Sequence, residues 1–87
     1  MRKTRPCVVV SPDELNEHLR TAIVVPLTTG GQAYPWRIRC LFQNRAGFIA
    51  LDQVRVVDRE GLLKHVGSLG PQTVTKALET LQEMFAP

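Results

Sequence analysis

The fold is decided by residues 36–42, which read Trp-Arg-Ile-Arg-Cys-Leu-Phe. The even-numbered positions are apolar, and Arg37 and Arg39 fall between them. Successive side chains of a β-strand point to opposite faces, so this alternation predicts a half-buried strand. We expect one face of the strand to lie on a core and the two arginines to face outward.

Short apolar runs on both sides of this strand predict a sheet. The run at residues 21–27 contains Pro26, which has no N–H to donate to a ladder. We therefore expect an edge or a bulge at that end of the strand. Ser11-Pro12 predicts the start of a short helix in the polar loop that follows the first run. Residues 43–47 are predicted to form a turn. The remaining runs that predict strands are residues 6–10, 48–51, 54–57 and 62–69.

The last segment predicts a helix of about four turns, which begins at Gly70-Pro71. A helix with one apolar face must cover something, so we expect this face to pack on the sheet. The apolar residues that recur at helical spacing are Val74, Ala77, Leu78, Leu81, Met84 and Phe85.

Short strands followed by a single helix indicate a mainly β protein. Strands and helices do not alternate along the chain, which argues against a doubly wound parallel sheet. The prediction is a small antiparallel barrel with a C-terminal helix. A chain of 87 residues has room for one core, so residues 1–87 are predicted to form a single domain.

The composition is that of a globular protein, with 44% hydrophobic and 22% charged residues. No apolar run approaches the roughly 20 residues that span a bilayer. We therefore expect a soluble, cytoplasmic protein without a membrane partner. The formal net charge of +3 is compatible with a polyanionic partner but does not require one.

Conventional catalytic motifs are absent from the sequence. It contains no glycine-rich phosphate loop and no activated serine. Cys7 and Cys40 lie in apolar runs and are predicted to be buried thiols. Together with His18 and His65 they do not have the spacing of a zinc site, so no metal and no cofactor are expected.

Two features suggest phosphate chemistry. Thr28 and Thr29 end an apolar run and precede two glycines, so their hydroxyls and the glycine N–H groups are suited to bind phosphate. An ordinary turn at a strand end is the alternative. Arg5 directly precedes a predicted strand, which would hold its guanidinium in place. A guanidinium held in this way is suited to stabilise the negative charge on a reacting phosphate. A structural ion pair with Asp52 or Asp58 is the alternative for this arginine.

Four blocks of the sequence, in order, resemble the MazF/PemK family of toxins. The first is residues 5–12, Arg-Pro-Cys-Val-Val-Val-Ser-Pro. The second is Val-Pro-Leu-Thr-Thr at residues 25–29, followed by Tyr-Pro-Trp at 34–36. The third ends with Leu-Asp-Gln-Val-Arg at residues 51–55, and the fourth is Leu-Gly-Pro at 69–71. Their spacing agrees over the whole chain.

This resemblance implies a homodimer of SH3-like barrels with a C-terminal helix. It implies a metal-independent, sequence-specific endoribonuclease, the toxin of a type II toxin-antitoxin system, which cleaves single-stranded RNA and binds a cognate antitoxin. By analogy Arg5 and Thr28 are the catalytic residues. Arg5 takes part in proton transfer or transition-state stabilisation, and Thr28 holds the scissile phosphate. Thr29, Arg37 and Arg39 are expected RNA contacts.

The resemblance also implies that the chain is N-terminally shortened. Family members begin with a strand of the type Gly-Asp-Ile-Val and a loop that ends in Gly-Ser-Glu. That glutamate would fall one position before Met1, so we expect the family's first strand and this carboxylate to be missing. Two alternatives to a ribonuclease stay open: an impaired toxin that binds antitoxin or RNA without cutting, and a gyrase-targeting toxin of the CcdB type. The presence of Arg5 and Thr28 favours RNA over gyrase.

Overall fold

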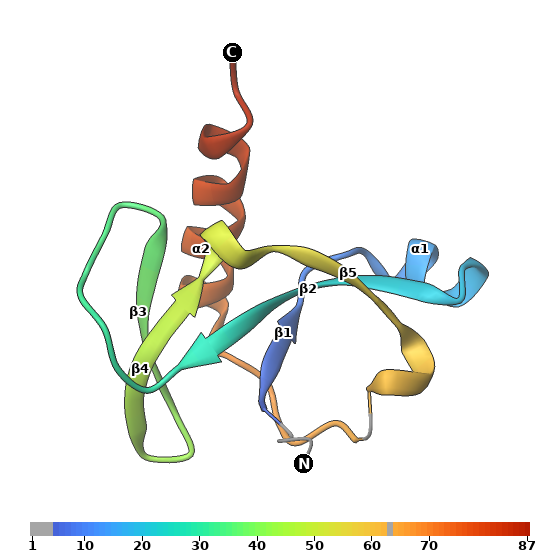
Figure 1. Ribbon diagram of the computed structural model, residues 1–87, viewed down its shortest axis with the longest axis horizontal. Coiled ribbons are helices and arrows are strands. Elements are labelled where there is room, and N and C mark those ends of the chain that lie inside the picture. The colour runs from blue at the N-terminus through green and yellow to red at the C-terminus, as the bar shows by residue number, and fades with distance from the viewer. Residues whose placement is uncertain (1–4, 63) are drawn as a thin grey trace.

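A computed structural model describes residues 5–62 and 64–87 of the protein (Figure 1). The elements follow one another in the order β1 (Cys7–Val9), α1 (Asp13–His18), β2 (Thr21–Thr28), β3 (Arg37–Phe42), β4 (Arg45–Ala50), the 3-10 turn η1 (Leu51–Gln53), β5 (Arg55–Asp58), the 3-10 turn η2 (Arg59–Gly61) and α2 (Pro71–Met84). None of the helices in these ranges is long and apolar enough to cross a membrane.

The long strand β2 is the centre of the sheet. One of its edges pairs antiparallel with β1, in the register Cys7↔Pro26. Its other edge pairs first with β5, through residues 21–24, and then with β4, through residues 27 and 28. The two parts of the sheet share β2 and form a half-barrel (Figure 1). The predicted antiparallel, mainly β fold with a C-terminal helix is confirmed.

Pro26 lies in a central strand rather than at an edge. It falls in the interval where the edge of β2 changes its partner from β5 to β4. A proline is tolerated there because no ladder bond needs its missing N–H. The break in pairing therefore takes the place of the predicted edge or bulge.

Strands β3 and β4 form a hairpin with the register Phe42↔Arg45. Gln43 and Asn44 make the turn and have φ values of 51° and 63°, the left-handed combination that joins twisted strands tightly. β4 therefore begins at Arg45, three residues earlier than the apolar run predicts. The strand predicted at residues 36–42 is confirmed, since Ile38 and Cys40 are buried while Arg39 and Leu41 are exposed.

The core lies between the sheet and α2. Ala77 is the buried contact of α2, and Leu81 packs partly against the same cluster. The core cluster consists of Val25, Ile38, Cys40, Ile49, Leu51 and Ala77. Cys7 is half-buried, and both cysteines are free thiols whose pKa values burial raises. Both are therefore protonated at neutral pH. The prediction of a buried thiol is confirmed for Cys40, whereas Cys7 lies outside the core cluster.

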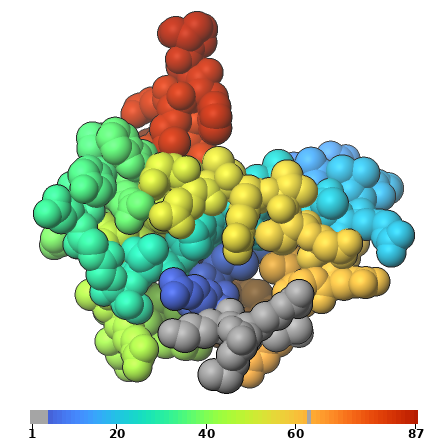
Figure 2. Space-filling view, in the orientation of Figure 1, coloured from blue at the N-terminus to red at the C-terminus, as the bar shows by residue number. Residues whose placement is uncertain are grey.

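The predicted helix is confirmed over Pro71–Met84, but its apolar face is only partly covered. Val74, Leu78 and Met84 stay exposed, and Phe85 is 71% exposed just beyond the helix. Thr80 is buried instead and donates its hydroxyl to the Lys76 carbonyl at 2.8 Å. The C-terminal half of α2 projects beyond the sheet (Figure 2), so the sheet covers less of the helix than predicted.

The strand predicted at residues 62–69 is wrong. The described residues of this segment form an irregular connection that leads into α2. Gly67 has a φ of 150° and lies against the ring of Phe42, where an added Cβ would come within 3.3 Å. An L-residue rarely adopts that conformation, so the backbone leaves the β region there and no strand can continue.

Ser11 does not cap the first helix. Its hydroxyl accepts a hydrogen bond from the Ile23 N–H at 3.0 Å and donates to the Asn16 side chain. The N-cap of α1 is Pro12, which has no side-chain cap. Ser11 thus fastens α1 to β2 rather than starting the helix.

The core makes a prediction about stability. Leu51 is fully buried, so Leu51→Ala removes methyl groups and leaves a cavity. We expect it to lower the free energy of unfolding by about 2–5 kcal/mol. Leu41→Ala is the matched control, since Leu41 is 69% exposed, and we expect a change within about 0.5 kcal/mol. Urea denaturation measures both, and equal losses would contradict the described core.

Candidate functional site

Three side chains form a row across the outer face of the β2–β4–β3 part of the sheet. Thr28 pairs with Phe48, and Phe48 pairs with Arg39. Directly opposed residues of antiparallel strands project to the same face. The neighbouring row Leu27–Ile49–Ile38 projects to the other face and into the core.

Arg5 extends this row on the far side of β2. The pairing of β1 with β2 begins at Cys7↔Pro26, and the Leu27 N–H donates to the Pro6 carbonyl at 3.1 Å. The ladder thus reaches Pro6, one residue short of Arg5. Continued by that one residue, the same register would bring Arg5 opposite Thr28, on the face of Phe48 and Arg39.

The two carboxylates proposed as structural partners of Arg5 are engaged elsewhere. Asp52 pairs with Arg37, and Asp58 accepts from the Glu60 N–H at 2.9 Å within its own turn. Among the described residues, the ion pairs do not include Arg5. The structure therefore offers no support for the structural alternative, and the Arg5 side chain is exposed.

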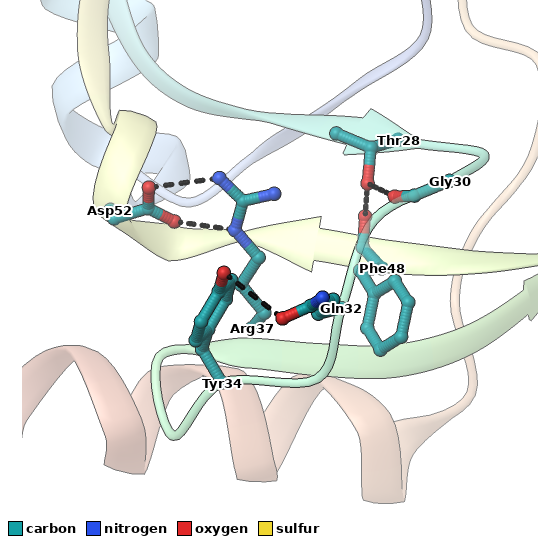
Figure 3. Close-up of polar contacts among 7 residues, drawn as sticks. All are labelled: Thr28, Gly30, Gln32, Tyr34, Arg37, Phe48 and Asp52. Carbon is teal, nitrogen blue, oxygen red and sulfur yellow. Dashed lines mark hydrogen bonds and ion pairs between the residues drawn. The ribbon is translucent and has the colours of Figure 1, made fainter.

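Thr28 presents its hydroxyl at the point where β2 ends (Figure 3). The hydroxyl donates to the Gly30 carbonyl at 3.2 Å, and the Phe48 carbonyl lies 3.5 Å from the same oxygen. Both distances are long for O–H···O bonds, so a phosphate oxygen could replace either acceptor at small cost. Thr29 follows in the exposed loop.

Arg37 and Arg39 both project from the outer face of β3, but their surroundings differ. Arg39 is exposed, and its Cζ lies 5.9 Å from the ring centroid of Phe48. Arg37 donates from Nε and Nη2 to the two carboxylate oxygens of Asp52, each at 3.0 Å (Figure 3). This fork uses the planar geometry of arginine and fixes the guanidinium.

The Arg37–Asp52 fork is partly shielded from solvent, with side-chain exposures of 17% and 33%. The hydrogen bonds from Arg37 lower the pKa of Asp52 below its ordinary value. The bond to Asp52 likewise raises the pKa of Arg37. Arg37 is therefore held in place by its partner, while Arg39 is open to a ligand.

Gly47 sets the position of Thr28 from the opposite strand. A Cβ at Gly47 would overlap the carbonyl oxygen of Thr28 and lie 3.6 Å from Cα of Thr29. Only glycine lets β4 approach the end of β2 this closely. The location of the candidate phosphate-binding hydroxyl thus depends on a residue that carries no functional group.

Sequence reasoning missed Phe48, Gly47 and the role of Asp52. Local spacing gave no signal for the fork, because its two residues are 15 positions apart. The register of the β3–β4 hairpin would have found it: Arg37 pairs with Ala50 at the end of β4, and Asp52 follows in η1.

Comparisons with known proteins match this architecture. A family model described as PemK-like, MazF-like toxin of type II toxin-antitoxin system matches residues 1–85. No curated protein sequence matches the chain.

Several solved structures share the fold. Toxin MazF-mt6 of Mycobacterium tuberculosis has a TM-score of 0.82 at 18% identity, over 93% of this chain and 85% of that one. A MazE-MazF crystal structure from Deinococcus radiodurans has a TM-score of 0.81 at 20% identity, over 92% and 80%. An endoribonuclease in complex with its cognate antitoxin, from a mycobacterial species, has 0.81 at 22%, over 91% and 78%. At these identities the likeness establishes the fold.

Gly47→Ala tests the close approach of β4 to Thr28. The added methyl group must push the backbone of β2 aside, so we expect unfolding free energy to fall by about 1–3 kcal/mol. The control is Gly61→Ala, where a Cβ would meet nothing within 4 Å. Thermal or urea unfolding compares the two variants, and equal stability would refute the close approach.

The fork predicts a pH dependence. Because the pKa of Asp52 is lowered in the folded state, the fork is complete above about pH 4, the ordinary range of an aspartate. It is lost as the pH falls through the lower folded-state value. Trp36, the single tryptophan, lies next to Arg37 and reports on the change by fluorescence. We expect an acid transition that Asp52→Asn abolishes and Asp13→Asn, at an exposed position, preserves. An unchanged transition in Asp52→Asn would contradict this role.

Proposed function

Since the chain belongs to the family of PemK-like, MazF-like toxins of type II toxin-antitoxin systems, we propose that it is a metal-independent endoribonuclease that cleaves single-stranded RNA at specific sequences. The solved relatives include one titled as an endoribonuclease from mycobacterial species, with a TM-score of 0.80. Metal independence and sequence specificity rest on the resemblance to the family.

The observation that supports this proposal is the register of β1 on β2, which would bring Arg5 opposite Thr28 when it is continued beyond Pro6. A guanidinium and a hydroxyl on neighbouring strands, on one exposed face, can contact the same phosphate. Arginine binds phosphate through two parallel N–H···O bonds, and the threonine hydroxyl adds a third donor. These groups suit a reaction at phosphorus.

In the proposed reaction, the 2′-hydroxyl oxygen of the RNA attacks the adjacent phosphorus. The O2′–P bond forms and the P–O5′ bond breaks, which leaves a 2′,3′-cyclic phosphate and a 5′-hydroxyl. The 2′-hydroxyl proton passes to solvent. Arg5 stabilises the negative charge that grows on the phosphoryl oxygens, and the leaving O5′ takes a proton from water. Thr28 holds the phosphate during this displacement.

RNA binding away from the scissile phosphate falls to the neighbouring side chains. Arg39 is exposed in the same row and can contact a second phosphate. Thr29 follows Thr28 in the loop and can donate from its hydroxyl or its N–H. Arg37 is bound to Asp52, so its proposed part is to shape the surface and to contribute positive charge.

The proposed protein partners are a cognate antitoxin and a second copy of the chain. Solved relatives are titled as MazE-MazF assemblies and as an endoribonuclease with its cognate antitoxin. The apolar side chains that α2 leaves exposed supply a surface for such partners, and those of Leu78 and Phe85 are the most exposed on this segment. The proposed place of action is the cytoplasm, where messenger RNA is found.

The test is incubation of the purified protein with a long RNA in EDTA. We expect cleavage to give 5′-hydroxyl ends, which a polynucleotide kinase can label directly. Arg5→Ala and Thr28→Val should each slow cleavage by about 10²-fold or more, since each removes a donor to the reacting phosphate. Thr28→Val keeps the branched shape and removes only the hydroxyl.

Arg20→Ala is the matched control, because it removes the same charge from a side chain that is 86% exposed beside α1. We expect it to cleave at the wild-type rate. RNA binding without cleavage by the wild-type protein would refute the enzymatic proposal in favour of a non-cutting toxin. Cleavage that survives both Arg5→Ala and Thr28→Val would refute the proposed site.

A further inference from the structure

Two parallel aromatic rings lie just before β3, and a cavity separates Trp36 from the last turns of α2. The ring centroids of Tyr34 and Trp36 are 5.6 Å apart, and their planes differ by 4°. Both side chains remain substantially exposed, at 44% and 40%. Exposed aromatic rings are the surfaces on which single-stranded nucleic acids stack their unpaired bases.

This ring pair is held rigidly. The Cζ of Arg37 lies 5.8 Å from the ring centroid of Tyr34, and the fork to Asp52 fixes the guanidinium (Figure 3). The backbone is fixed as well, because the Leu51 N–H donates to the Trp36 carbonyl at 3.1 Å. A surface ordered before binding loses little conformational entropy when a ligand arrives.

A cavity opens beside Trp36. It has a volume of about 200 Å³ and lies between the residues before β3 and the last turns of α2. Its lining consists of Pro35, Trp36, Thr80, Glu83 and Met84. An aromatic wall and apolar neighbours suit a flat heterocycle. The Thr80 hydroxyl is already bound to the Lys76 carbonyl, which leaves the Glu83 carboxylate as the polar group for a ligand.

The chemistry of Glu83 selects among bases. A carboxylate accepts hydrogen bonds from exocyclic amino groups, as glutamate does from N4 of cytosine. Adenine, cytosine and guanine have such a group, whereas uracil has none. The carboxylate also repels phosphate, so the strand must enter the cavity base first with its backbone outside.

Positive charge outside the cavity suits a strand whose base lies inside it and whose phosphates lie outside. Arg39 lies three residues beyond Trp36, on the opposite face of β3, in the row that leads through Phe48 to Thr28. Because β3 is the edge strand of this part of the sheet, an RNA strand can pass around that edge from Arg39 to the cavity. The net charge of the protein is +3, which adds a general attraction for RNA.

We propose that the Tyr34–Trp36 ring pair and the cavity beside it bind one unpaired nucleobase of single-stranded RNA, with a preference for bases that carry an exocyclic amino group. This base site rests on the proposed function and names a contact of the substrate away from the scissile phosphate.

Trp36 makes the proposal directly testable, since it is the single tryptophan of the chain. The probes are 2′-O-methyl RNA oligonucleotides of about eight nucleotides, which bind but cannot be cut at a blocked 2′ position. Random-sequence, all-adenine, all-cytosine and all-uracil oligonucleotides are compared with an abasic strand of equal charge. Anisotropy of an end-labelled probe measures binding, and Trp36 fluorescence of unlabelled complexes measures stacking.

We expect oligonucleotides with bases to quench Trp36 fluorescence and the abasic strand to leave it unchanged. Trp36→Leu should weaken binding about tenfold or more, and Trp36→Phe should restore most of the affinity because it keeps a ring. Glu83→Ala should remove the preference for adenine and cytosine over uracil. Glu79→Ala, one turn earlier on the same helix and outside the cavity, should keep it.

The outcomes separate this base site from the enzymatic proposal. An anisotropy rise without a change in Trp36 fluorescence, or wild-type affinity of Trp36→Leu, overturns the base site and leaves RNA cleavage untouched. Quenching without cleavage of an unmodified RNA overturns the enzymatic proposal and supports the base site. No binding of any oligonucleotide overturns the base site, and absence of cleavage in the same preparation then overturns both.

Discussion

The antiparallel ladder along β2 is the constraint on which the rest of the structure depends. Because the side chains of a strand alternate between faces, the register of β2 decides which of its residues enter the core. Leu27 packs toward the core, so Thr28 must face outward, and its partners on both edges follow it. A slip of one residue would bury Thr28 and expose Leu27. The register of β2 therefore determines both the hydrophobic core and the candidate phosphate-binding row.

A second interaction, the Arg37–Asp52 fork, positions the loop that the β2 ladder does not hold. Residues 29–36 have no strand to guide them, and the Arg37–Asp52 fork ties the end of this loop to η1. Exposed ion pairs contribute little to stability, but this one is bidentate and partly shielded. Its main effect is on geometry, because Tyr34 lies against the same guanidinium. The loop that follows Thr28 thus returns to the sheet at a defined place.

The sequence predicted the fold better than it predicted the site. Alternation at residues 36–42 reflects burial, which the structure confirms. Helical spacing after Pro71 predicted the helix itself but only part of its burial. The strand predicted at residues 62–69 failed because apolar content cannot reveal the backbone conformation of Gly67. Arg5 and Thr28 were singled out by their places beside predicted strands, and their catalytic roles were assigned by resemblance. Sequence spacing did not reveal the fork, because Arg37 and Asp52 come together only when β3 and β4 pair.

The change of partner along β2 has a consequence for how the protein responds to heat. The β3–β4 hairpin joins β2 through only two residue pairs, Leu27↔Ile49 and Thr28↔Phe48. Ile49 of this seam is fully buried and shares the core cluster with Val25 of β2, so the seam opens only when the core itself opens. Thr28 belongs to the seam itself, so opening it separates the hydroxyl from Phe48 and Arg39. We therefore expect heat to dismantle the candidate site and the core together, over one range of temperature.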